Sequence, residues 1–351
     1  MTGSTMNTQR DDRQLAIWLL VVCTLIFAMV VLGGVTRLTH SGLSMVDWHP
    51  IHGILPPMND AEWLEEFEQY KQSPEYLKIN QHKGMGVEEF KSIFWFEYWH
   101  RILGRIIGLA FLLPFLYFLA RGKIRRPMVP RFVIMFVLGG LQGLLGWYMV
   151  KSGLVDKPSV SQYRLTAHLL AAVTIYIYIL WHVLSLWTSH QIPVSDTRAH
   201  GLKKHGLFVT GLIIVMIMSG GFVAGTKAGY TFNDFPFMHG SLLPPGGMAL
   251  EPWWLNFFDN LATVQFTHRV LAIVVMLAVL SYAIRAWRNP ALASGTRNVF
   301  ILLLAMLVIQ ITLGITTLIY VVPVPLGAAH QAGALLLLTI ALITNHRLRA
   351  H

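Results

Sequence analysis

Eight long apolar runs recur along this 351-residue chain, and they limit its possible folds more than any other feature. Each run is about 20 residues or longer, the length that an α-helix needs to cross the hydrocarbon core of a bilayer. Backbone polar groups in lipid must be satisfied within the protein, so such runs form helices. The sequence therefore predicts an all-α polytopic membrane protein. The eight spans are expected near residues 14–36, 93–120, 130–151, 163–188, 203–225, 262–287, 298–321 and 327–346.

The charge of the chain agrees with a membrane location. Charged residues make up 13% of the chain and the net charge is +10. The basic residues cluster in short connections between alternate spans, as the positive-inside rule expects, so the excess does not indicate nucleic-acid binding. This pattern predicts that the lipid bilayer surrounds the protein and that both termini are cytoplasmic. The short polar N-terminus favours a bacterial inner membrane over an imported organelle protein.

Four short patterns of the first half return in the second half. Two of them, Trp99-His100-Arg101 with Thr267-His268-Arg269 and Gln142/Gly146 with Gln310/Gly314, share an offset of 168 residues. The other two are Ala167-His168 with Ala329-His330, and residues 42–47 with residues 229–234. An offset that recurs at several positions predicts an internal repeat.

The repeat predicts two four-helix bundles in parallel orientation, because four spans separate equivalent positions. The first domain would cover residues 1–188 and include a large outer loop, 37–92. A polar linker, 189–202, would connect it to a second domain, 203–351. Within the outer loop, Asn59 and Glu62 form a capping-box pattern that predicts a short amphipathic helix over residues 61–70. This helix would lie on the membrane surface or cover a site.

Each even-numbered span carries one histidine in its outer part: His100, His168, His268 and His330. A single histidine on an apolar helix is usually a hydrogen-bonded structural residue, but four at matched positions, two in each half, favour metal ligation. Two imidazoles that face each other between helices suit haem iron better than zinc, which needs more protein ligands. The chain has only one cysteine, Cys23, so a disulfide within it is excluded. The expected pairs are His100/His168 and His268/His330.

Three arginines lie close to these histidines and are candidates to pair with haem propionates: Arg101, Arg164 and Arg269. They could equally reach lipid headgroups. Arg37 and Lys227 are weaker candidates. Gln142 and Gln310 are explained by hydrogen bonds between helices, and the glycines around Gln142 would allow close packing or make room for a macrocycle.

The repeat is broken beside the first histidine of each pair. Glu97 stands three residues before His100, whereas Gln265 stands three residues before His268. Residues three apart on a helix share a face. A carboxylate in a desolvated pocket can move protons, so Glu97 is expected to be catalytic, with the second half carrying electrons. The alternative is that Glu97 forms an ion pair with Arg101.

These features together resemble the haem A synthase family, in its cysteine-free proteobacterial and mitochondrial branch. The resemblance rests on Glu97-x-x-His100-Arg101, the stretch Gly33-Gly34-Val35-Thr36-Arg37-Leu38-Thr39 and the duplicated helix plan, and it covers nearly the whole chain. It implies an oxidoreductase that oxidises the C8 methyl group of haem O to a formyl group, by two hydroxylations and loss of water, to give haem A for terminal oxidases. It implies haem O as substrate on His100 and His168, and haem b as cofactor on His268 and His330.

Several points stay open at the level of sequence. Two histidine ligands leave the iron no position for oxygen, so either one ligand leaves or electrons are removed and water attacks. A haem O synthase and an acidic, ferredoxin-like electron carrier are expected partners. The main alternative function is a di-haem b electron-transfer protein of the quinol-oxidising type, although histidines at a single depth argue against it. A transporter would need matching helix breaks.

Overall fold

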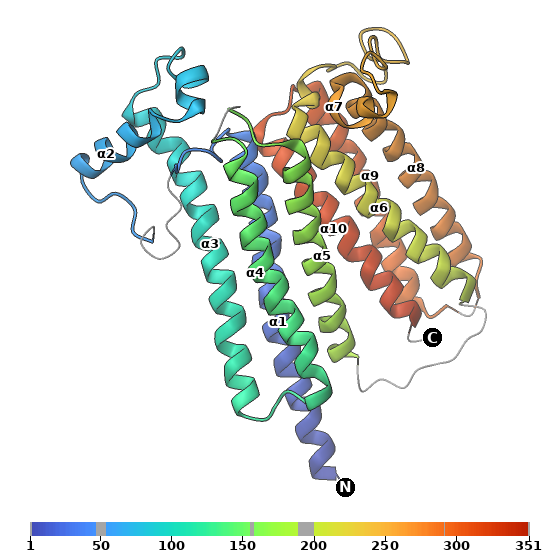
Figure 1. The fold of residues 1–351 in the computed structure, drawn as a ribbon. Coiled ribbons are helices and arrows are strands. Elements are labelled where there is room, and N and C mark those ends of the chain that lie inside the picture. Colours follow the sequence, from blue (N-terminus) through green and yellow to red (C-terminus); the bar gives the residue numbers. More distant parts are fainter. Residues whose placement is uncertain (1, 47–53, 155–157, 189–199, 291, 350–351) are drawn as a thin grey trace.

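The computed structural model describes residues 2–46, 54–154, 158–188, 200–290 and 292–349. These residues form helices joined by loops. The described part of the chain contains no strand, and its β-type pairing is limited to an isolated bridge between Met238 and Ser241. Eight of the helices in this described part are long and apolar enough to cross a membrane. The expected all-α, eight-span class is thus confirmed (Figure 1).

The eight long helices are α1 (Thr2–Leu38), α3 (Val87–Ala120), α4 (Val129–Lys151), α5 (Gln162–Trp187), α6 (His200–Thr226), α8 (Leu261–Trp287), α9 (Ser294–Ile319) and α10 (Val324–Arg349). Two short α-helices lie in the described connections: α2 (Asp60–Tyr70) and α7 (Asn256–Asp259). The third long helix of the chain, α4, begins close to its expected position. By contrast, α3 begins earlier than expected, because Glu89 accepts a hydrogen bond from the Gly86 backbone N–H at 3.0 Å and caps a polar first turn.

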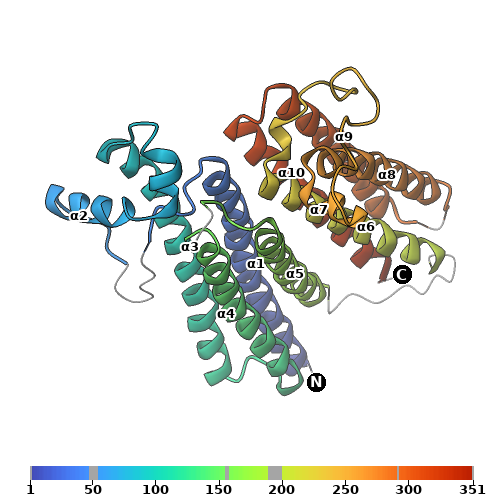
Figure 2. The same cartoon turned by 45° about the horizontal axis from the view of Figure 1, so that its top comes forward.

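The helices pack in the same order in both halves. In the first half α1 contacts α3 and α5, and α4 contacts the same two helices; in the second half α6 contacts α8 and α10, and α9 contacts those two. The halves meet where α5 and α10 pack against α6 and α1, and the two groups of four lie side by side in both views (Figures 1 and 2). The origin of this order in a sequence repeat, and the division into two domains, stay predictions.

Glycines at the contact between the two halves allow their helices to pack closely. A Cβ at Gly34 would lie 2.2 Å from the Gln331 amide oxygen, and Gln331 donates a hydrogen bond to the carbonyl of Val30 at 2.6 Å. A Cβ at Gly221 would similarly lie 2.9 Å from the Thr166 hydroxyl. Small residues let helix backbones approach closely where lipid supplies no hydrophobic drive for association.

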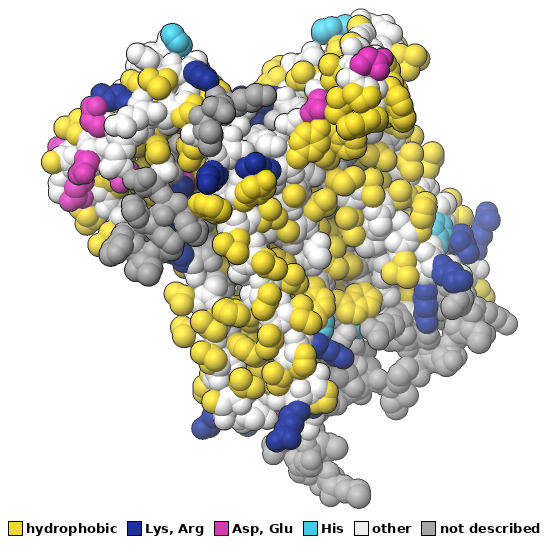
Figure 3. Space-filling model, in the orientation of Figure 1, with side chains coloured by type: hydrophobic (Ala, Val, Ile, Leu, Met, Phe, Trp, Pro, Cys, Tyr) yellow, Lys and Arg dark blue, Asp and Glu magenta, His cyan; other side chains and the backbone are white. Residues whose placement is uncertain are grey.

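The flank of the molecule is apolar, and the basic side chains gather towards its ends (Figure 3). On α3 and α4, Leu109, Leu113, Leu141 and Leu144 are 54%, 60%, 54% and 56% exposed. Leucines in water would be a liability at this density, whereas in lipid they are in their preferred surroundings. The chain is therefore a multi-pass membrane protein.

The helix α2 begins at the predicted N-cap Asn59, although Glu62 accepts from the Met58 backbone N–H and not from that of Asn59, so the reciprocal bond of a capping box is absent. The Asn59 side chain accepts from the Glu62 backbone N–H at 3.0 Å. Trp63, Phe67 and Tyr70 are buried against the start of α3. The apolar face is thus occupied inside the protein and is not free to lie on a membrane. We call the end of the molecule that carries α2 and α7 the α2 end; α1 begins and α10 ends at the opposite end (Figure 1).

Candidate functional site

The four predicted histidines lie towards the α2 end of their helices. His168, His268 and His330 fall within the first eight residues of α5, α8 and α10, and His100 lies further along α3 because that helix extends beyond the others at its start. All four helices begin at the α2 end (Figure 1). The four histidines therefore lie towards the same end of their helices, and their common depth in a membrane stays a prediction.

The second pair of histidines faces across the bundle. The ring centroids of His268 and His330 are 6.5 Å apart and the ring planes are inclined by 77°. Two imidazole nitrogens that each bind one metal ion at about 2 Å would put the ring centres ~6 Å apart. This spacing fits an iron held between the two rings.

The first pair is arranged in a related way. His100 lies on α3 and His168 on α5, and both helices pack against α1 and α4. A Cβ at Gly33 of α1 would lie 3.2 Å from His100 Nε2, and a Cβ at Gly220 of α6 would lie 3.4 Å from His268 Cε1. A glycine on the first helix of each half thus leaves room for the ring of the first histidine.

The second histidine of each pair packs against a glutamine and a glycine of the preceding helix, and we call the glycine contact a glycine cradle. The Gln142 amide donates to the carbonyl of His168 at 2.9 Å, and the Gln310 amide donates to the carbonyl of His330 at 3.0 Å. One turn later, a Cβ at either Gly146 or Gly314 would lie 2.9 Å from Cε1 of the same histidine. The sequence predicted interhelical hydrogen bonds for both glutamines, and the structure shows that each bond reaches the backbone of a histidine.

The donor set fits haem and does not fit zinc. Within the part of the chain that the structure describes, no group of three or more His, Cys, Asp or Glu side chains could hold a metal ion. A structural zinc site needs four such ligands and a catalytic one usually three. Paired imidazoles with glycine cradles instead match a metal whose remaining ligands come from a macrocycle.

Glu97 is buried, and both of its carboxyl oxygens accept hydrogen bonds. The residue is 3% exposed. Its Oε2 accepts from the Ser44 hydroxyl at 2.8 Å and from the Met45 backbone N–H at 3.0 Å. Its Oε1 accepts from Nε and Nη2 of Arg101 at 3.1 and 2.5 Å. The ion pair with Arg101, which was the alternative reading of Glu97, is therefore present, and the carboxylate also fixes the loop that follows α1.

Gln265 occupies the corresponding place in the second half. It donates hydrogen bonds to its loop, whereas Glu97 accepts them from its loop. Its amide donates to the carbonyls of Ala228 and Phe232 at 2.8 and 3.1 Å, and its oxygen accepts from Arg269 Nη2 at 3.0 Å. Arg269 also donates to the carbonyls of Phe232 and Phe237 at 3.0 and 2.8 Å. An amide here can meet loop carbonyls that a carboxylate would repel.

The candidate propionate arginines all have protein partners. Arg101 donates to the carbonyl of Met45 at 2.8 Å in addition to Glu97. Arg164 donates to the carbonyl of Tyr148 at 2.8 Å and its guanidinium carbon lies 3.7 Å from the centroid of the Tyr148 ring. Arg37 reaches across the halves and donates to the carbonyls of Ala224 and Gly225 at the end of α6, at 3.0 and 3.1 Å. Their pairing with propionates stays a prediction.

A second buried acid lies near Glu97 in the loop after α2. Glu75 is 7% exposed and accepts from the Tyr70 hydroxyl at 3.1 Å. Burial raises the pKa of Glu75 to about 7; the negative charge of Glu97 adds to this effect, whereas the bond from Tyr70 and the charges of Lys227 and Lys83 oppose it. The burial of Glu75 is not predicted from the sequence, because nothing in its neighbours indicates it.

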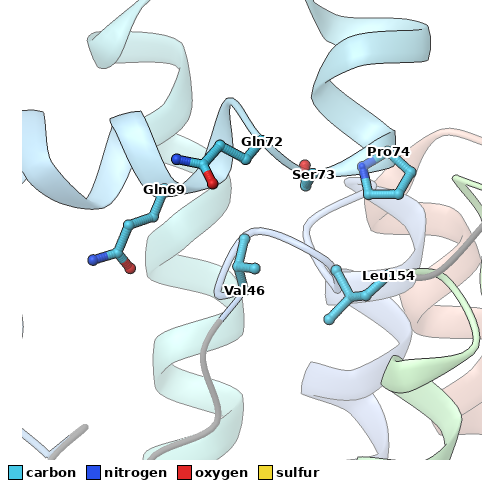
Figure 4. A pocket seen from close by; sticks show the side chains of 6 residues that line it. All are labelled: Val46, Gln69, Gln72, Ser73, Pro74 and Leu154. Carbon is cyan, nitrogen blue, oxygen red and sulfur yellow. The ribbon is translucent and has the colours of Figure 1, made fainter.

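A pocket of about 290 Å³ opens beside this loop, between the end of α2 and the turn after α1 (Figure 4). Val46, Gln69, Gln72, Ser73, Pro74 and Leu154 line it. Val46 directly follows Met45, so the segment that Glu97 fixes forms one wall. None of the four histidines lines this pocket, so it is separate from the paired imidazoles.

Fold and site together define a class: an eight-helix integral membrane protein with a pair of facing histidines in each half, suited to holding haem. Comparison with known proteins gives the family. A family model described as cytochrome oxidase assembly protein matches residues 16–342, and the chain belongs to this family.

Curated relatives extend over nearly the full chain. Proteins named Heme A synthase from Nitrosospira multiformis and Nitrosomonas eutropha are 52% and 50% identical to it, over 99% and 95% of this chain and 98% and 93% of their own lengths. A protein of the same name from Paramagnetospirillum magneticum is 46% identical over 99% of both chains. The family resemblance inferred from the sequence is thereby confirmed.

Proposed function

We propose that this chain is a haem A synthase, an oxidoreductase that converts the C8 methyl group of haem O to a formyl group. The observation that carries the proposal is the 52% identity, along nearly the whole of both chains, to a protein named Heme A synthase. The di-haem electron-transfer alternative is not favoured, because relatives over the full length share the synthase name.

We assign haem O to His100 and His168, and a permanent haem b to His268 and His330. The glycine cradles at Gly146 and Gly314 support both assignments, because each leaves space beside an imidazole that a Cβ would fill. When bound, haem supplies redox chemistry that no side chain of the chain offers. The protein residues hold the macrocycles, exclude water and handle protons.

Glu97 is the residue that separates the two pairs chemically. It is a carboxyl group beside His100, whereas Gln265 beside His268 is a neutral amide. Arg101 donates to this buried carboxyl group at 2.5 Å, so Glu97 is not left without a partner. We assign Glu97 to the catalytic centre, where it accepts or holds a proton released as the methyl group is oxidised. Arg101, Arg164 and Arg269 would also neutralise propionates.

The surroundings of the protein follow from its charge distribution. We place it in the bacterial inner membrane with both termini in the cytoplasm, so the α2 end faces outward. At the opposite end a pocket of about 670 Å³ is lined by Arg10, Asp11, Ala120, Arg121 and Lys123. This basic surface would suit an acidic, ferredoxin-like electron carrier. A haem O synthase is the expected source of the apolar substrate.

The decisive experiment is chemical analysis of the haem. The protein is produced in cells that make haem O but no haem A, then purified, and the extracted haem is resolved into types B, O and A by chromatography. We expect haem A to appear only when this chain is present, together with one retained haem B. Haem B alone, with quinol oxidation and no formyl product, would establish the electron-transfer alternative instead.

A further inference from the structure

The second ring nitrogens of the four histidines are held very differently in the two halves. In the second half, Nδ1 of His268 lies 2.7 Å from the Ser219 hydroxyl oxygen. The single hydrogen of that hydroxyl is donated to the carbonyl of Met216 at 2.8 Å. Its oxygen therefore accepts a hydrogen from Nδ1. This tautomer leaves the lone pair of His268 on Nε2, where a metal can bind it.

The partner ring in that half is also held at Nδ1. The Gln310 amide nitrogen lies 3.1 Å from His330 Nδ1 while it donates to the carbonyl of the same residue at 3.0 Å. A half-turn of the amide would present its oxygen to Nδ1 at the cost of the bond to the carbonyl, so this side chain can meet either tautomer of the ring but keeps both contacts in only one orientation. Both rings of the second pair thus have a side-chain contact that fixes their rotation.

The first half lacks both contacts. His168 Nδ1 is buried and has no hydrogen-bond partner among the described residues, since the Gln142 amide reaches only the backbone carbonyl. The His100 ring likewise receives no hydrogen bond from the described residues. Gly33 and Gly220 pack against His100 and His268 respectively, so Leu32 occupies the place that corresponds to Ser219. A leucine cannot accept a hydrogen bond.

We propose that Ser219 and Gln310 are positioning residues that make the second haem non-exchangeable, and that the lack of equivalent contacts lets the first half admit and release its haem. This inference rests on the proposed function, because it takes haem as the ligand of both pairs. Partners of the second ring nitrogen orient a metal-bound histidine and raise its basicity, and their loss typically weakens metal binding by about 10-fold to 100-fold. A substrate site must release product, whereas a cofactor site must not.

The test measures haem release by type. The full-length protein, loaded in cells that supply haem O, is mixed with an excess of apomyoglobin as haem acceptor. The haem left on the protein is extracted over time and resolved by chromatography. In the native protein we expect haems O and A to leave faster than haem B.

In Ser219→Ala we expect release of haem B to become about 10-fold to 100-fold faster, with release of haems O and A unchanged. Ser219→Thr keeps a hydroxyl and should restore slow release. The low-spin electron paramagnetic resonance signal of haem B should shift in Ser219→Ala, since the basicity of its ligand changes. Leu32→Ser should have the reverse effect and slow the release of haems O and A.

The matched control is Ser281→Ala. Ser281 also contacts a histidine, His205, at 3.2 Å and donates to a backbone carbonyl three residues earlier, but away from the paired histidines. It should leave both release rates unchanged. Unchanged haem B release in Ser219→Ala, or equal acceleration of all haem types, would overturn the inference. If the protein held only haem B, the proposed function would fail, yet two release phases with only the slow one accelerated would still support the role of Ser219.

Discussion

Glu97 and Gln265 occupy corresponding places in the two halves, and the comparison between them separates anchoring from chemistry. Each side chain stands three residues before a histidine, contacts the loop that follows the first helix of its half, and meets an arginine four residues later. The acid accepts from a loop N–H and a hydroxyl, whereas the amide donates to two loop carbonyls. Either group anchors a loop, so anchoring alone does not explain why one half carries an acid.

The arginines sharpen this comparison, because their contacts correspond most closely. Arg101 donates to the carbonyl of Met45 at 2.8 Å, and Arg269 donates to the carbonyl of Phe232 at 3.0 Å. The loops are therefore held alike by the cations. What differs between the halves is the side chain three residues before the first histidine, an acid in one half and an amide in the other, together with the Nδ1 contacts of both rings.

The largest expected effect is that of Glu97→Gln, which makes the first half resemble the second. Formyl production should fall by at least ~100-fold, because a positioned acid or base contributes that much to proton transfer. Both haems should stay bound, since the histidines and cradles are unchanged. Chromatographic analysis of haem types checks both statements. Native levels of haem A from this variant would remove Glu97 from the catalytic centre.

The reciprocal change, Gln265→Glu, should act on stability rather than on chemistry. An ionised carboxylate would face the carbonyls of Ala228 and Phe232, which now accept hydrogen bonds from the amide. Leaving these buried acceptors unsatisfied should cost about 2–3 kcal/mol, partly offset by Arg269. Thermal unfolding of the purified protein, followed by haem B absorbance, measures this loss. A melting temperature equal to that of the native protein would show that the two loops tolerate either group.

The loops of the two halves at the α2 end should differ in their response to pH. Glu75 has a pKa raised from 4.5 to about 7, so between these values the folded protein binds a proton that the unfolded chain does not. The free energy of unfolding should therefore fall as pH rises from about 4.5 to about 7, by up to roughly 3 kcal/mol. Glu75→Gln should abolish this slope, which hydrogen exchange of the α2 segment across pH would detect.

Asp234 provides the control for that measurement. It accepts from the backbone N–H groups of His239 and Gly240, which lower its pKa below the usual value. Asp234 is therefore ionised throughout the same pH window in both the folded and the unfolded state, and Asp234→Asn should leave the slope unchanged. A slope that survives Glu75→Gln would mean that another group titrates there.

The smallest effect is expected from closing the glycine cradles one at a time. A Cβ at Gly146 or Gly314 would lie 2.9 Å from an imidazole carbon, so the ring must move. Overpacking of this kind costs about 1–3 kcal/mol, which corresponds to roughly 5-fold to 150-fold in haem binding. Gly146→Ala should reduce haem O and A, and Gly314→Ala should reduce haem B. Equal loss of all haem types from either variant would mean that each pair does not hold its own haem.

Much of the fold could be predicted because its signals are local. A run of apolar residues long enough to span a bilayer has one stable conformation there, so all eight spans were predicted near their observed positions. The Asn59 capping-box pattern likewise depends on residues three apart. The helix over residues 61–70 was therefore expected correctly, although the burial of Trp63 against Phe90 and Phe94 was not.

The sequence by itself determined the helices, the matching histidines and the single acid that breaks the match, because spacing and residue type are carried along one chain. Only the tertiary structure decided what those groups touch. The contact of Glu97 with Met45 joins residues 52 apart, and that of Ser219 with His268 joins residues 49 apart. No local pattern encodes such pairings, since they arise when packed helices bring distant turns together. The difference between a firmly held and a loosely held histidine pair therefore emerges only from the packed molecule.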